Sequence, residues 1–274
     1  ADFKGEHEAW YNFLSAKNVS LNLLFVHAEF KNPNRLVHGS HMAQLGMVVR
    51  TALTGNLFTI EFSASALPPH KVVVRDGAGA MVKTVTHGSG SFVAENLIVS
   101  MREKRHGVLG AKGWRGAVML VNTGRWLVEA ASKAFPNAVL NRGKALLDVQ
   151  LNPLYDADHD SVAPHGLIGQ SWDGDGVGFD GAQDDYTTTE VTTAAMAEGA
   201  IEGTAADYEV EDKFATAFKY SRFDAVAASP RDTSKLSGSR KVGRRGGPVG
   251  AYPDVADPLD PAESESVIPM ETSR

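Results

Sequence analysis

The residues best suited to chemistry are aspartates in two acidic segments that flank a short apolar stretch between residues 154 and 186. The first segment, 156–160, places an aspartate at every second position. The second, 173–185, carries five carboxylates within thirteen residues: Asp173, Asp175, Asp180, Asp184 and Asp185. Clustered oxygen ligands in a flexible loop suit a hard cation, and calcium fits such loops better than magnesium does. The pattern indicates a calcium site.

Ordinary turn chemistry explains the same aspartates. Asp-Gly pairs are common turn formers. The second segment also departs from the EF-hand loop, because Val177 occupies its fifth position and no glutamate closes it. A single Gly-x-Gly-x-Asp at 176–180 is similar to one calcium-binding nonapeptide repeat, but such repeats need a stack of copies. A calcium site and a set of turns both stay open.

Between the two acidic segments lies the sequence HGLIGQ at residues 165–170. Two glycines bracket the apolar pair Leu167 and Ile168. This pattern predicts a tight turn that buries the pair and lets backbone or ring atoms approach closely. We therefore expect a structural role, with no part in catalysis, for His165, Gly166, Gly169 and Gln170.

An enzyme or a sugar-binding domain is the alternative. Paired carboxylates can perform acid–base catalysis, with His159 or His165 beside them. However, the chain has no Gly-x-Ser-x-Gly, His-Glu-x-x-His, phosphate-binding or dinucleotide-binding motif. Trp172 or Trp114 could stack against a sugar. We expect no catalytic activity, and the alternative is a carbohydrate-binding or hydrolytic domain that uses segments 156–160 and 173–185.

Composition limits the class of protein. The chain has 274 residues, of which 43% are hydrophobic and 22% charged, as in a globular protein. Its net charge of −6 argues against nucleic acid as the partner. It contains no cysteine, which excludes a disulfide framework, a thiolate nucleophile and a zinc–thiolate site. Its apolar runs reach only about five residues, far short of a membrane span.

Most of the chain before residue 154 is predicted to form β-strands. Alternation predicts a hairpin over 9–30 with one buried face, because Val19, Leu21 and Leu23 alternate with polar residues. Further strands or strand pairs are expected at 36–52 and 57–64 (a strand pair each), 72–74, 81–85, 89–100, 118–121, 126–130, 145–151 and, as a closing strand, 214–223. Residues 102–105 are expected to form a charged loop, and 190–206 is the helix candidate. His38 and His41 are expected on a strand surface.

Strands at this spacing predict an all-β protein, an antiparallel β-sandwich or flattened barrel with long loops and an irregular C-terminal tail. We place the β domain at residues 1–223 and a low-complexity charged tail at 224–274, where apolar side chains become sparse. Because the chain opens directly on a strand-like stretch, we expect a processed product or an excised fragment.

Two distant segments resemble a known family. Asp2-Phe3-x-Gly5 with YNFLS at 11–15 and VSLN at 19–22, and later PLYD at 153–156 with HGLIGQ, resemble von Willebrand factor type D-like domains of the cysteine-free plant root-cap and algal type. The resemblance covers about residues 1–225. It implies a non-enzymatic extracellular or cell-surface module for assembly or adhesion, whose partner is a protein or a glycan, and which can oligomerise. The disulfide cysteines of the animal domains are absent, which argues against covalent multimers.

Overall fold

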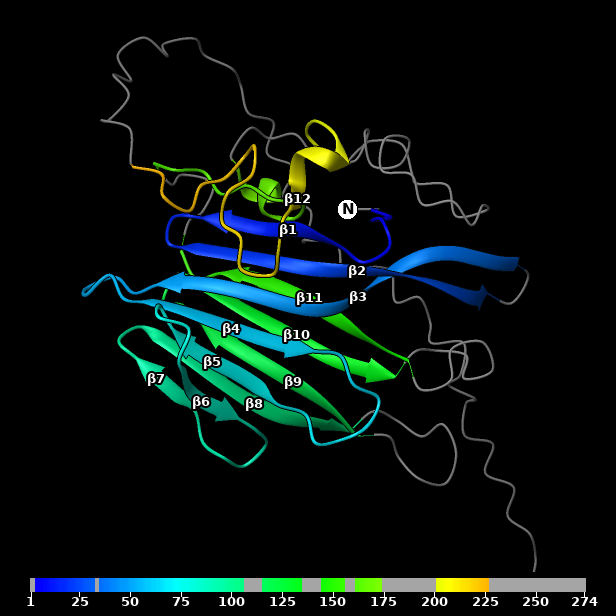
Figure 1. Cartoon of the computed structure of the whole chain (residues 1–274), viewed down its shortest axis with the longest axis horizontal. Coiled ribbons are helices and arrows are strands. Elements are labelled where there is room, and N and C mark those ends of the chain that lie inside the picture. The colour runs from blue at the N-terminus through cyan, green and yellow to red at the C-terminus, as the bar shows by residue number, and fades with distance from the viewer. Residues whose placement is uncertain are drawn as a thin grey trace, which may run out of the picture. The chain divides into compact units, whose positions relative to one another are not determined.

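Period-two alternation builds two antiparallel sheets in the computed structural model, which describes residues 3–32, 35–105, 115–134, 144–155, 161–173 and 201–226 (Figure 1). The first sheet runs, in spatial order, through β12 (Glu209–Val210), β1 (Ala9–Ala16), β2 (Val19–Asn32), β3 (Arg35–Arg50), β4 (Leu57–Ser63), β5 (Val72–Asp76) and β6 (Met81–Val85). The second runs through β11 (Ala145–Pro153), β10 (Trp126–Ala134), β9 (Arg115–Asn122), β8 (Leu97–Arg105) and β7 (Phe92–Ala94). Two 3₁₀ helices, η2 (Gly169–Trp172) and η3 (Ala205–Tyr208), complete the described elements.

The apolar residue at every second strand position points between the sheets. Leu45 lies opposite Leu23 on one side and Phe62 on the other, and all three are fully buried. In the second sheet the corresponding positions include Met119 and Val128. Side chains of both sheets belong to one core. The sheets do not close into a barrel, so the all-β prediction is confirmed in its sandwich form.

Two predicted strand pairs are single strands. Residues 36–52 were expected to turn, but β3 is continuous because β2 pairs with it along its whole length, from Val19 opposite Val49 to Asn32 opposite Arg35. β3 has a β-bulge where the register shifts between Leu24 and Phe25, and pairing with β2 continues on both sides of it. Residues 57–64 likewise form the one strand β4. The hairpin at 9–30 and the β5–β6 hairpin are as predicted.

The predicted charged loop at 102–105 is wrong, because these residues are the end of β8. They continue the ladder with β9, from Arg102 opposite Val118 to Arg105 opposite Arg115. Arg102 is exposed and pairs with Glu129 on β10 at 3.0 Å. Charged side chains are tolerated here because alternate positions of a strand face water.

The predicted closing strand at 214–223 is also wrong. Residues 211–226 contain turns and no strand, and the two-residue β12 pairs with β1 instead, Val210 opposite Trp10. The backbone of this segment turns repeatedly, with hydrogen bonds from Ala215 to Asp212 and from Ser221 to Phe218. A chain that turns this often cannot lie along a neighbouring strand.

The helix candidate at 190–206 lies outside the described residues up to 200. Residues 201–204 form a bend that contains Gly203 with φ +74°, and the short η3 follows. Chain contacts divide the protein into two units, residues 1–230 and 231–274. The second unit, and with it most of the predicted tail, lies outside the described residues.

Candidate functional site

The face of β1, β2 and β3 that points away from the second sheet, here called the outer face, carries polar side chains and is nevertheless covered. Asn12, Ser15, Ser20 and Asn22 are all completely buried. The prediction that the first hairpin has one buried face is therefore wrong, since both of its faces are covered. The segments that cover the outer face are residues 161–173 and a second segment near the end of the described chain.

Residues 165–170 attach to β1 through backbone hydrogen bonds. His165 and Ser15 exchange a pair of N–H···O bonds of 2.6 and 2.7 Å, and Leu167 donates to the Asn12 carbonyl at 3.0 Å. Gly166 has φ +109°, and a Cβ there would lie 2.6 Å from the Asn12 Oδ1 atom. Glycine is required at 166 for both reasons. Leu167 is fully buried and Ile168 is half-buried.

Residues 201–226, here called the strap, cross the outer face (Figure 1, yellow to orange). The Asn22 side-chain amide donates to the carbonyls of Asp212, Lys213 and Ala215, at 3.4, 3.2 and 2.7 Å. At Gly46 on β3 the strap backbone comes so close that an added Cβ would collide with the Lys213 carbonyl oxygen. The asparagine and the glycine together make a seat for the backbone of the strap.

The far end of the strap is fixed near the β1–β2 turn. The Arg222 N–H donates to the Ser15 Oγ at 2.8 Å, and the Asn18 N–H donates to the Phe223 carbonyl at 3.0 Å. Arg50 pairs with Asp224 at 2.7 Å and places its guanidinium over the Phe223 ring, which is buried. The strap is therefore held along its length by side chains of the first three strands.

His165, in the first covering segment, lies where that segment meets the strap. Its Nδ1 accepts the Gly166 N–H at 2.9 Å, so the neutral ring carries its proton on Nε2, which donates to a Glu202 carboxylate oxygen at 2.9 Å. The Tyr220 ring stacks on the imidazole at 4.4 Å and 12°, and Tyr208 lies at 5.8 Å and 27°. Burial lowers the pKa of His165, and the hydrogen bond and charge of Glu202 oppose this only in part.

Gln170 connects the same groups. Its Oε1 accepts the Glu202 N–H at 2.8 Å, and its Nε2 donates to the carbonyls of Leu167 and Gly166 at 3.0 and 3.3 Å. The Tyr208 hydroxyl donates to the Glu202 carbonyl at 2.8 Å, and burial raises the pKa of Tyr208 far above its usual range. We call His165, Gln170, Glu202, Tyr208 and Tyr220 the clamp.

The chemistry available to the clamp follows from these bonds. Both ring nitrogens of His165 have partners, and an aromatic ring covers a face of the imidazole. The carboxylate of Glu202 is the exposed member, with 60% of its side chain accessible. This arrangement can hold residues 161–173 and the strap together, and it can respond to protonation of His165.

Of the predicted metal ligands, only Asp173 lies among the described residues. Asp173 directly follows η2 and is half-buried. Asp175, Asp180, Asp184 and Asp185 lie outside the described residues, as do 156–160, so the calcium site stays a prediction. Within the described part of the chain no group of three or more His, Asp or Glu side chains could hold a metal ion.

The predicted sugar platform at Trp172 packs against the core. Its ring meets the fully buried Trp126 edge-on, with centroids 5.4 Å apart, and Tyr155 meets Trp126 at 5.8 Å. The Arg125 guanidinium lies 3.9 Å from the centre of the Tyr155 ring. Trp172 is half-buried, which reduces the ring area open to a sugar. Trp114 lies outside the described residues.

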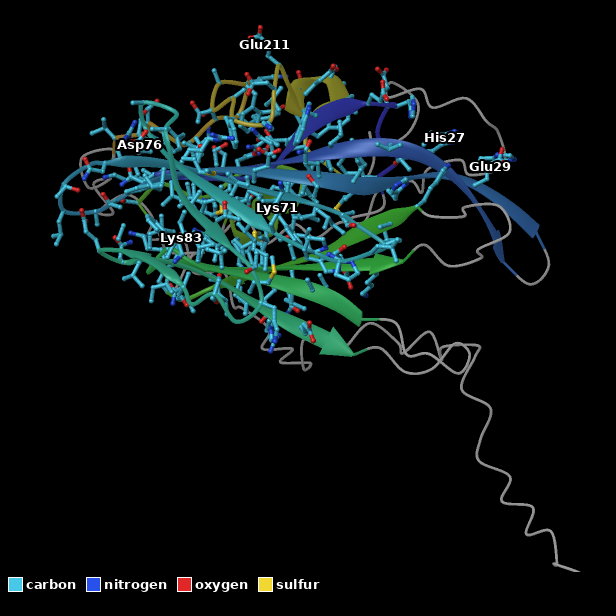
Figure 2. The ribbon with its side chains drawn as sticks, turned by 60° about the horizontal axis from the view of Figure 1, so that its bottom comes forward. His27, Glu29, Lys71, Asp76, Lys83 and Glu211 are labelled. Atoms are coloured by element: carbon cyan, nitrogen blue, oxygen red, sulfur yellow. The ribbon has the colours of Figure 1, made fainter. Side chains whose placement is uncertain are left out.

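The histidines of the long hairpin lie apart from the clamp. Figure 2 shows His27 and Glu29 on the hairpin of β2 and β3, and Glu211 on the strap. His38, expected on a strand surface, is half-buried on β3 and its Nδ1 lies 3.1 Å from Glu29. His41, also half-buried, has its pKa lowered to about 4 by burial.

Sequence reasoning missed the clamp residues of the strap and the asparagines of the outer face. Glu202, Tyr208 and Tyr220 lie more than thirty residues from His165 along the chain, and no motif spacing links them to it. A usable signal was present in the hairpin. Asn12, Ser20 and Asn22 are short amides and hydroxyls, whereas a solvent-facing strand position more often carries a charged side chain.

No family model, curated protein or solved structure matches the chain. The resemblance to von Willebrand factor type D-like domains therefore stays a prediction. In the described residues no helix is both long and apolar enough to cross a membrane.

Proposed function

We propose that this chain is a non-enzymatic structural and interaction module of the extracellular space or cell surface, used in assembly or adhesion. The observation that carries the proposal is the clamp. The imidazole that could have served as a base bonds instead to the Gly166 N–H and to Glu202, and so joins the two covering segments, while the His165 backbone pairs with Ser15 of β1. The most elaborate polar cluster among the described residues thus serves to hold the fold.

The open edges of the sandwich support an assembly role. The edge strand β6 exposes Met81 and Val82, at 61% and 43%, and the edge strand β7 exposes Val93 at 63%. Edge strands also present unpaired backbone groups, and natural proteins usually protect such edges with charge or proline. Apolar side chains at an open edge suit a protein partner.

The first test separates the module from an enzyme or a sugar-binding domain. The purified chain and its Glu202→Gln variant are compared on a panel of glycoside, ester and phosphodiester substrates and on a glycan array. We expect no turnover and no glycan signal from either protein. Turnover or glycan binding by the unaltered chain would contradict the proposal, and its loss in Glu202→Gln would place the site at the clamp.

The second test concerns location. Intact source cells are treated with a membrane-impermeant amine reagent, and the chain is then isolated and its lysine labelling is measured. Lys17 and other exposed lysines should be labelled before lysis. Labelling that appears only after lysis would place the chain inside the cell and overturn the extracellular part of the proposal.

A further inference from the structure

We propose that the strap is a pH-controlled cover: protonation of His165 detaches residues 201–226 from the outer face of the first sheet, while the sandwich beneath stays folded. The proposal is independent of the function proposed above. It rests on how the clamp is bonded and on how little of the strap belongs to the sheet.

The geometry of His165 accommodates only the neutral ring. A second proton would have to sit on Nδ1, where the Gly166 N–H now donates at 2.9 Å, so that two donors would face each other. Gly166 cannot move away easily, because its backbone is pressed against Asn12 and Phe13 of β1. Protonation therefore requires the imidazole to leave its place between Gly166 and Tyr220.

The surroundings of the ring do not compensate for a positive charge. The titratable and charged groups that face His165 are Glu202, Tyr208, Tyr220, Asp173 and Arg222. Glu202 and Asp173 favour the charged ring, whereas burial and the Arg222 charge oppose it. The attraction of Glu202 is weakened by water because its carboxylate is exposed. The Lys219–Asp207 pair beside Tyr220 is internal to the strap and moves with it.

The strap is separable from the sandwich because few backbone bonds join them. Its contribution to the sheet is the two-residue strand β12. One further backbone bond runs from the Asn18 N–H to the Phe223 carbonyl, and side chains such as those of Asn22 and Ser15 provide further attachments. The strands beneath pair with each other over their whole length and supply most of the core, to which the strap adds Ile201 and Tyr208. Loss of the clamp therefore uncovers the outer face and the edge of β1 without opening the interior.

The sign of the effect follows from the linkage. In the covered state the pKa of His165 lies below its ordinary value, and in the released state it returns to that value, near 6.5. The released state thus binds more protons as the pH falls below about 6.5. At pH 5.0 release is favoured by at most about thirtyfold over neutral pH, the ratio of protonated to neutral imidazole in the released state.

The experiment uses the absence of cysteine from the chain. A single thiol is introduced by Ser20→Cys, at a buried position on the outer face whose hydroxyl bonds to Asn12 and makes no bond to the strap. A second protein carries Val121→Cys in the inner core. Both are labelled with a pyridyl disulfide at pH 7.5 and 5.0, and the rates are divided by those of a model thiol.

We expect the corrected rate of the Ser20→Cys protein to rise severalfold, up to about thirtyfold, between pH 7.5 and 5.0, while the core thiol stays protected. In the same background Glu202→Gln should keep the onset near pH 6.5 and make the rise at least as large, because the covered state loses the carboxylate that favours the charged ring. His165→Gln should abolish the rise, and His41→Gln, at another histidine with a lowered pKa, should leave it unchanged.

Three results would overturn the proposal. The thiol on the outer face could stay equally protected at both pH values. Both thiols could become reactive together, which would mean global unfolding. The rise could disappear with His41→Gln or shrink with Glu202→Gln, which would mean that His165 is not the titrating group. If His165→Gln fails to fold, the comparison of Glu202→Gln with His41→Gln still decides the question.

Discussion

Two glycines on or against the first sheet mark where the covering segments touch it. Gly166 needs both a positive φ and the absence of a side chain, and Gly46 needs only the latter. Gly166 belongs to the motif that the sequence marks. Gly46, in contrast, looks like a weak point in a strand pattern, and its role depends on a segment more than 160 residues away.

Gly46→Ala tests the seat of the strap. The new methyl group would collide with the Lys213 carbonyl, so the strap must shift, and overpacking of this kind costs about 1–3 kcal/mol. The measurement is urea unfolding at pH 7.5. The matched control is Gly77→Ala in the β5–β6 turn, where the nearest atom would lie at 3.3 Å. Equal stability of the two variants would mean that the strap does not rest on Gly46.

The apolar pair of the motif gives a second prediction at this scale. Leu167 is fully buried against the core, so Leu167→Ala should cost about 2–5 kcal/mol of unfolding free energy. Ile168 is only half-buried, and Ile168→Ala should cost clearly less. Chemical denaturation of both variants measures the difference. The reverse order, or an unchanged midpoint for Leu167→Ala, would remove the motif from the core.

At the scale of elements, alternation along the sequence predicts the strands well because each inner position is apolar and each ladder is local. It fails where bonding to another segment overrides the pattern within the segment. The continuity of β3 depends on β2 beside it, and the charged end of β8 is kept in the sheet by β9. The strap escapes prediction because its carbonyls bond to the Asn22 side chain and not to a neighbouring strand.

The acidic segment 173–185 gives a prediction that the described residues leave untested. If its aspartates converge, their repulsion destabilises the empty loop, and calcium binding raises the melting temperature of the chain. Magnesium should do less, because it requires tighter octahedral geometry. Melting curves with chelator, magnesium or millimolar calcium are compared for the unaltered chain, Asp175→Asn and Asp180→Asn. Equal temperatures in all three conditions would identify these aspartates as turn residues.

At the scale of the whole molecule, protons act on folding through several histidines at once. Burial lowers the pKa of His27, His41 and His165 in the folded chain. An unfolded chain restores ordinary values near 6.5 and binds more protons below that pH. The contribution of these histidines to the unfolding free energy is therefore complete above about pH 6.5 and decreases as the pH drops. For His41 the decrease ends near pH 4.

Urea unfolding at pH 7.5, 5.5 and 4.0 tests this expectation. The midpoint should fall at each step for the unaltered chain, and His41→Gln should reduce the fall between pH 5.5 and 4.0. Carboxylates contribute to acid unfolding as well, so the informative quantity is the difference between variant and parent. Parallel profiles would show that His41 is not buried in its neutral form.

We conclude that residues 165–170 and the strap are integral parts of the β domain, bonded to the outer face of β1 and β2. Amide hydrogen exchange of the full chain at pH 7.5 tests it directly. The amides of Ser15, Leu167 and Arg222, which donate to His165, Asn12 and Ser15, should exchange far more slowly than those of an unstructured peptide. Exchange of Leu167 and Arg222 at the rate of an unstructured peptide, with β3 still protected, would contradict the claim.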